Sequence, residues 1–278
     1  MNKLSISADS TADIEWCFEK YDIQTVPGQV IIGDKTFKDG IDIVPDDIYN
    51  AVEKQNILPK TAAGHENDYT TVFESAKGKP HLHIALSPEF SASYDNAMRA
   101  AEAFPNVTVV NSGNMSAGLG LTCIIARELA SEGKTKEQVV EALKLIIPKI
   151  KANFMVDTLH YLHRGGRCSG LKLFAANLLK LHPMIYVDAY GKMLPGKKFR
   201  GKFAVTVKSY VAYVLEKNPN INKDLIIVAH TDISTDIQKQ VEDDLKAAGF
   251  KNVYNTLLGC TLTTHCGRNT IGLGFRND

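Results

Sequence analysis

The sequence lacks the features that are typical of secreted and membrane-spanning chains. Its cysteines number five, an odd count, and no two of them form a CxxC pair. The stretch MNKLSISADST at the start has a single lysine and no apolar run of signal-peptide length. These features favour a cytoplasmic protein with reduced thiols. The longest uncharged stretch, residues 103–126, is interrupted by proline and asparagine, so we expect no transmembrane segment and at most transient membrane contact.

An excess of charge of one sign is also missing. The chain of 278 residues has 32 Lys and Arg against 31 Asp and Glu, a net charge of +1. This balance argues against broad electrostatic binding of nucleic acid. Residues 192–208 nevertheless form a local basic stretch without any acid, with Lys192, Lys197, Lys198, Arg200, Lys202 and Lys208.

Several signatures of enzymes are absent as well. The chain has no GxGxxG, no P-loop ending in GK[ST] and no GxSxG nucleophile elbow. The spacing of Cys260, His265 and Cys266 matches no zinc pattern, so we expect neither a metal nor a cofactor. A nucleophile paired with a histidine needs spatial contact that a sequence does not show. An acyl hydrolase or transferase that uses Ser93 or Cys266 with His265 therefore remains an alternative.

Apolar runs of strand length alternate with helix-period segments in the first half of the chain. The expected strands are 4–8, 23–32, 35–37, 81–86 and 107–110, and the expected helices 11–20, 45–55, 66–77, 91–103, 116–131 and 136–150. Gly33-Asp34 is a hairpin signal between two of these strands. The strand–helix alternation predicts a parallel sheet covered by helices.

From about residue 153 the pattern changes to hairpins mixed with helices. The expected strands are 153–157, 184–188, 192–194, 225–230, 253–258 and 272–275, and the expected helices 171–181, 201–217 and 234–248. We therefore predict an α/β protein of two domains. Residues 1–153 form a parallel-sheet α/β N-terminal domain, and residues 154–278 an α+β C-terminal domain, with exchange of segments between them allowed.

Polar loops follow three of the predicted strands and open helices, where α/β sheets bind ligands. These loops are residues 9–11, 87–94 and 111–116, each rich in hydroxyls or amides. Such residues commonly cap helices, but three of these loops at one sheet edge favour an anion or carboxyl pocket. Residues 60–65 link two helices and are either a plain turn or a place where a ligand approaches the backbone. Arg164 and Arg167 flank Gly165-Gly166 and suit either phosphate binding or salt bridges between domains.

Taken in order, these segments resemble the DegV family, which includes the fatty-acid-binding subunits of bacterial fatty acid kinase. The resemblance spans the whole chain and rests on six short segments rather than on one decisive motif. They are DSTAD at 9–13, Thr61 in its loop, LSPEFSASY at 86–94, YLHRGGR at 161–167, LKLHPM at 179–184, and HCG at 265–267 followed by IGLG at 271–274.

The resemblance implies two α/β-type domains with an acyl chain, such as palmitate, stearate or oleate, buried between them. It implies that Thr61, Ser93 and His265, with Ser91 as a further candidate, bind the carboxylate. The family's binding subunits present this group to a separate kinase, and the resemblance places Arg200 and Arg167 on the surface that meets it. The chain itself would catalyse nothing. Ala62-Ala63 stand where the family has further hydroxyls, so carboxylate binding should depend more on Thr61, Ser93 and His265.

Affinity for such a ligand should come mainly from its tail, because each buried CH₂ contributes about 0.8 kcal/mol. A sixteen-carbon chain would gain on the order of 10 kcal/mol before ordering costs. We expect the predicted helices 116–131 and 171–181 to line the tunnel. A regulatory protein that binds a partner and no small ligand is a further alternative.

Overall fold

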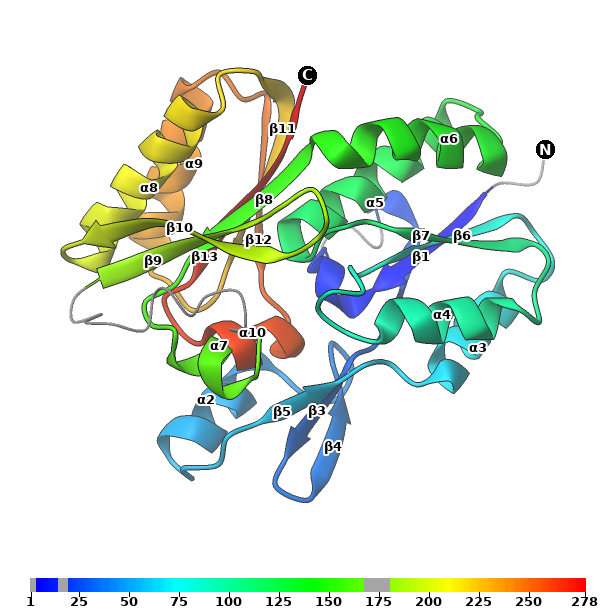
Figure 1. The fold of residues 1–278 in the computed structure, drawn as a ribbon, viewed down its shortest axis with the longest axis horizontal. Coiled ribbons are helices and arrows are strands. Elements are labelled where there is room, and N and C mark those ends of the chain that lie inside the picture. Colours follow the sequence, from blue (N-terminus) through cyan, green and yellow to red (C-terminus); the bar gives the residue numbers. More distant parts are fainter. Residues whose placement is uncertain (1–3, 15–19, 168–180) are drawn as a thin grey trace.

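The computed structural model describes residues 4–14, 20–167 and 181–278, which form three β-sheets and the helices around them (Figure 1). The first sheet has the order β2-β1-β6-β7 and is parallel throughout. Its strands are β1 (Ser5–Asp9), β2 (Ile23–Val26), β6 (His81–Ala85) and β7 (Val107–Asn111). The predicted parallel α/β sheet in the first half of the chain is confirmed.

Helices cover both faces of this sheet, and the pleat of β1 shows which residues meet them. Ile6 and Ala8 point into the large apolar core under α5 (Ser116–Ser131). Ser7 and Asp9 alternate with them, as strand geometry requires, and face α3 (Glu66–Ser75) on the other side. A second helix on that side is α4 (Ser93–Ala101), which packs on α3 and β7. The strand thus ends with a polar side chain, Asp9, buried beneath α3.

The second sheet has six strands in the order β10-β9-β8-β13-β11-β12 and is mixed, since only β11 and β12 are parallel. Its strands are β8 (Ile150–Met155), β9 (Leu181–Val187), β10 (Met193–Arg200), β11 (Ile221–His230), β12 (Asn252–Leu257) and β13 (Ile271–Asn277). Helices α8 (Phe203–Lys217) and α9 (Thr235–Ala247) lie on one face (Figure 1). Residue 153 lies within β8, and the division at this residue into two domains stays a prediction.

Helix α5 lies between the two large sheets and contacts both (Figure 1). All residues from Ala117 to Arg127 are buried, which explains why this stretch is apolar around the whole helix rather than along one stripe. Gly274 of β13 permits the close approach, because a Cβ at this position would lie 2.5 Å from the Ala117 carbonyl carbon. The sequence predicted the bounds of α5 correctly.

A third, small antiparallel sheet has the order β4-β3-β5, with β3 (Gln29–Ile32), β4 (Lys35–Lys38) and β5 (Lys60–Ala62). The predicted hairpin at Gly33-Asp34 is confirmed. The single strand expected over residues 23–32 is wrong. Pro27 lacks a backbone donor and interrupts the pairing, so β2 and β3 belong to different sheets. The plain turn considered for residues 60–65 is also wrong in its first half, because β5 pairs with β3.

The remaining elements are α2 (Pro45–Glu53), α6 (Lys136–Ile146), α7 (His160–Arg164), α10 (Cys260–Cys266) and the 3-10 turns η1 (Ser10–Ala12) and η2 (Ile147–Lys149). The sequence did not predict α10. Of the helix expected over 11–20, the structure describes a short turn at η1 and residue 20, while residues 15–19 lie outside the described part. The helix expected over 171–181 also lies outside the described part, except for residue 181. No helix among the described residues is long and apolar enough to cross a membrane.

Candidate ligand-binding site

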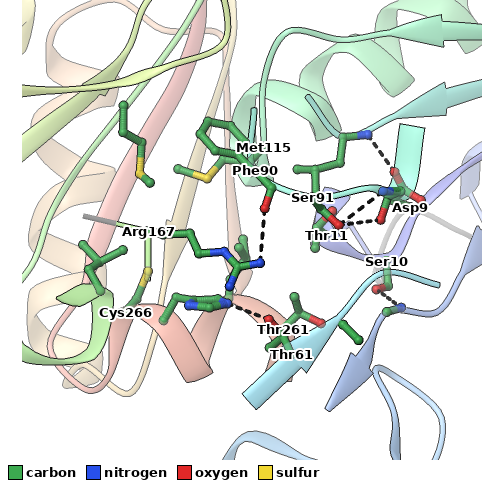
Figure 2. Close-up of a pocket in the computed structure, with 18 of the residues that line it drawn as sticks. Asp9, Ser10, Thr11, Thr61, Phe90, Ser91, Met115, Arg167, Thr261 and Cys266 are labelled. Atoms are coloured by element: carbon green, nitrogen blue, oxygen red, sulfur yellow. Dashed lines mark hydrogen bonds between the residues drawn. The ribbon is translucent and has the colours of Figure 1, made fainter. Parts of the chain in front are cut away.

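A cavity of about 60 Å³ lies where the loops of the first sheet, the small sheet and α10 meet (Figure 2). Segments far apart in the sequence contribute its walls: residues 9–11 at the end of β1 and in η1, 61–62 on β5, 90–93 before and at the start of α4, Arg167 after α7, and 261–266 on α10. Thr61, Ser91, Ser93 and His265 all line this cavity. The structure thus brings together the four residues that the resemblance proposed for the carboxylate.

Thr61 and His265 are in direct contact. The Thr61 Oγ1 atom lies 2.7 Å from His265 Nε2 in a hydrogen bond. Strand β5 holds Thr61 opposite Val30 of β3, and His265 lies in the last turn of α10. Burial of the ring, helped by the positive charge of Arg167, lowers the pKa of His265 from 6.5 to about 4. The imidazole is therefore neutral at neutral pH.

Ser91 and Ser93 form a second polar pair. Their hydroxyl oxygens lie 3.0 Å apart, and the backbone N–H of Ser93 donates to Ser91 Oγ at 3.3 Å. Behind them, the Tyr69 hydroxyl donates to Asp9 Oδ1 at 2.6 Å, and the Leu86 N–H donates to Asp9 Oδ2 at 2.7 Å. Burial, reinforced by Asp9, raises the pKa of Tyr69 well above its usual value, so this hydroxyl stays protonated and donating.

The two arginines that the resemblance assigned to a partner surface lie in different places. Arg200 is exposed at the end of β10 and is not among the lining residues of the cavity. Arg167 lines the cavity, and its guanidinium donates to the carbonyl oxygens of Gly165 at 2.8 Å and Phe90 at 3.4 Å (Figure 2). The contact of either arginine with a partner stays a prediction.

Three further residues with hydroxyls line the cavity, Ser10, Thr11 and Thr261, and the sequence did not put them forward as binding residues. The Oγ1 atoms of Thr11 and Thr261 are buried and have no hydrogen-bond partner among the described residues. Thr11 lies in the 9–11 loop, which the sequence did mark as a candidate. Thr261 and His265 share one face of α10, because residues four apart lie above each other on a helix. A helix prediction over 260–266 would have provided that signal.

A second, apolar cavity of about 30 Å³ lies next to the first and shares part of its walls. Met115, Phe154, Leu262 and Cys266 line both. The second cavity lies between α5 and the six-stranded sheet, and its other walls include Ala117, Ala152, Ala229, Leu258 and Leu273. The start of α5 contributes to this lining. The other helix expected to line a tunnel, 171–181, lies outside the described residues but for residue 181. The site thus has a polar end and an apolar end.

The geometry disfavours the alternative of a nucleophilic enzyme. Burial raises the pKa of the Cys266 thiol to about 12, so the thiol is protonated at neutral pH and is a poor nucleophile. The His265 Nε2 atom bonds Thr61, while the Ser93 hydroxyl bonds Ser91. Among the described residues, no three His, Cys, Asp or Glu side chains cluster as metal ligands do.

Comparison with known proteins agrees with the resemblance. The chain matches the family model described as "Uncharacterised protein, DegV family" over residues 3–278. A relative from Thermotoga maritima named "Fatty acid-binding protein" is 28% identical over 283 residues, which cover 98% of this chain and 97% of the relative. A solved T. maritima structure described as revealing a fatty acid binding function aligns over 100% of both chains, with a TM-score of 0.86 and 26% identity.

The fold is shared more widely. A DegV family protein from Thermus thermophilus aligns with a TM-score of 0.88 over 99% of this chain and 100% of its own, at 24% identity. Because the family model covers nearly every residue, the chain belongs to the DegV family.

Proposed function

We propose that this chain binds one long-chain fatty acid and presents its carboxylate to a separate fatty acid kinase in the cytoplasm. The observation that carries the proposal is that two adjacent cavities share four lining residues, Met115, Phe154, Leu262 and Cys266. One end gathers hydroxyls and a neutral imidazole from distant segments, and the other end is lined by apolar side chains. A fatty acid has the same division into one polar head and one apolar tail.

Thr61, Ser93 and His265, with Ser91, would bind the carboxylate. A buried carboxylate is costly unless hydrogen bonds satisfy it, and hydroxyl donors contribute roughly 1.5–3 kcal/mol each when the acceptor is charged. His265 donates through one ring nitrogen while it remains uncharged. The relative named as a fatty acid-binding protein supports a fatty acid as the ligand.

The tail would extend through the shared walls into the apolar cavity beside α5. Both cavities are narrow, with space for a few water-sized groups. An acyl chain must therefore displace side chains, and Met115, common to both cavities, is suited to this because its unbranched thioether adapts its shape.

Presentation to a kinase requires that the head lie near the surface. A third cavity of about 290 Å³ shares Phe90, Arg167 and Met193 with the first, and Lys192 and Glu89 are exposed along its rim. From this side the basic stretch continues along β10, where Lys197, Lys198 and Arg200 are exposed. We propose this face, with Arg200 and Arg167, as the surface that meets the kinase.

Native mass spectrometry of the protein after mild purification tests ligand binding. We expect an added mass equal to one fatty acid, identified by lipid extraction. Ser93→Ala should weaken binding of added palmitate by about tenfold, whereas Thr71→Val, on the exposed face of α3, should not. A chain that shows no added mass and does not take up palmitate would contradict the proposal. The kinase partner is tested by adding a fatty acid kinase and measuring phosphorylation of the bound acid. We expect Arg200→Ala to reduce this phosphorylation.

A further inference from the structure

The small sheet and α2, residues 29–62, form a small-sheet unit apart from the two large sheets. Figure 1 shows β3, β4, β5 and α2 on one side of α10, away from both large sheets. Within the described ranges, the strands of this unit pair only with one another. Val30, Ile43 and Ile48 pack together in a small core, which Cys260 of α10 completes. The small-sheet unit therefore has a sheet and a core of its own.

Hydrogen bonds hold the small-sheet unit against α10. The Asp39 carboxylate accepts from the backbone N–H groups of Cys260 at 2.7 Å and Thr261 at 3.2 Å. Thr61, at the other end of the unit, bonds His265, and both of these residues line the first cavity. Polar interfaces of this kind allow the parts that they join to move relative to one another. The unit is thus one wall of the cavity that can move without breaking either large sheet.

Arg268 fastens this wall. Its Nε atom lies 2.7 Å from Glu53 Oε1, and its guanidinium carbon lies 3.8 Å from the centre of the Tyr49 ring. Both partners belong to α2, whereas Asp232, the second carboxylate that Arg268 binds, follows β11. A single exposed ion pair contributes little to stability, but a guanidinium that stacks on an aromatic ring and binds two carboxylates forms a network. Because Arg268 itself follows α10, this network joins the small-sheet unit to the rest of the protein.

We propose that the small-sheet unit is a lid on this cavity and that Arg268 latches it shut. When the contacts of Arg268 break, the unit moves away from α10, Thr61 separates from His265, and a fatty acid can enter or leave. The part of the inference that concerns the ligand rests on the proposed fatty-acid binding. The shut cavity, of about 60 Å³, has space for only a few water-sized groups, so an opening gives the head group access. Opening also exposes Cys260, which is 1% exposed in the shut form.

Labelling of buried thiols tests the lid without any ligand. The ligand-free protein is incubated with iodoacetamide at constant pH, and digestion followed by mass analysis gives the labelling rate at each cysteine. Cys260 reports opening of the small-sheet unit, whereas Cys123, which is 0% exposed within α5, reports unfolding of the large core. A second measurement follows the release of bound palmitate into an excess of a fluorescent fatty acid.

The variants are Arg268→Gln, Glu53→Gln and the combination of the two. Arg99→Gln is the matched control, because Arg99 of α4 also pairs with a glutamate of a neighbouring helix, Glu66 of α3, at 3.3 Å. Arg99 lines neither of the two cavities of the proposed site. Its removal therefore costs one ion pair between helices and leaves the latch in place.

We expect Arg268→Gln to raise the labelling rate of Cys260 by about tenfold and to leave that of Cys123 unchanged. Glu53→Gln should act in the same way, and the double variant should exceed neither, because both changes break the same contact. Bound palmitate should be released faster by a similar factor. Arg99→Gln should match the wild type in both measurements.

An unchanged rate at Cys260 in Arg268→Gln overturns the inference, and so does an equal rise at Cys123, which indicates unfolding of the whole protein. Faster labelling of Cys260 with unchanged release of palmitate overturns the role of the lid in ligand exchange. A wild type that binds no palmitate contradicts the proposed function instead, and the thiol rates then still decide whether the unit opens.

Discussion

The Thr61 hydroxyl and the His265 imidazole are 204 positions apart in the chain, yet their Oγ1 and Nε2 atoms lie 2.7 Å apart at one end of a buried cavity. The contact joins the small sheet to α10, two elements that no local pattern connects. It fixes the ring orientation, because Nε2 has a partner while Nδ1 has none among the described residues. The pair is the structural centre of the proposed head-group site.

Removing the Thr61 hydroxyl should weaken fatty-acid binding without unfolding the protein. In Thr61→Val the side chain keeps its shape but loses its hydrogen bond to His265 and to the ligand. We expect the affinity for palmitate to fall by about tenfold, measured by displacement of a fluorescent fatty acid. Thr71→Val, on the exposed surface of α3, is the control. Equal affinities in the wild type and Thr61→Val would exclude this hydroxyl from the site.

Acidification should destabilise the protein in part through His265. The pKa of this ring is lowered from 6.5 to about 4 in the folded state by burial and by Arg167. Between these values the unfolded chain binds a proton that the folded chain does not, so stability is full above pH 6.5 and decreases as the pH falls toward 4. From pH 7 to pH 5 this contribution to the free energy of unfolding should drop by roughly 1–2 kcal/mol.

Urea unfolding of His265→Gln at both pH values measures this contribution. The variant should lose less stability on acidification than the wild type, while retaining the slope from His81, whose pKa burial lowers to about 3. His160→Gln, at an exposed position, should behave as the wild type. A pH dependence in His265→Gln equal to that of the wild type would mean that the ring titrates normally.

Gly165 should be intolerant of alanine although its backbone is not strained. A Cβ at this position would collide with His265 Nδ1, and the φ of −73° is one that alanine adopts readily. The ring must therefore shift from the position in which it bonds Thr61. We expect Gly165→Ala to lower palmitate affinity by about tenfold or more, with Arg164→Ala one position earlier as the control. Wild-type affinity in Gly165→Ala would show that the ring position does not matter.

Filling the apolar cavity should change the preferred length of the acyl chain. Ala229 of β11 is 2% exposed and lines this cavity but not the one that Thr61 and His265 line. Ala229→Leu should reduce binding of stearate more than that of laurate, because each methylene kept from burial loses about 0.8 kcal/mol. Competition between the two acids gives the ratio, and Ala212→Leu on the exposed face of α8 is the control. Equal losses for both acids would argue that the tail does not enter this cavity.

Much of the fold could be predicted from local patterns. The strand–helix alternation indicated the parallel sheet, Gly33-Asp34 the hairpin, and the apolar stretch ending before Gly133 the helix α5. The misses have a common cause. Strand β5 has three residues and pairs with a strand about thirty positions earlier, and α10 has only seven residues. Elements this short depend on tertiary partners rather than on their own propensity.

The sequence by itself determined the α/β class, the order of most elements, and the loops at 9–11 and 87–94 whose hydroxyls meet at the site. The resemblance to the DegV family added Thr61, Ser93 and His265. Only the tertiary structure decided that Arg167 lines the cavity, that Thr261 joins it, and that Cys266 is buried with a protonated thiol. The reason is physical: charge state and hydrogen bonding depend on burial and on neighbours distant in the chain, which local sequence does not encode.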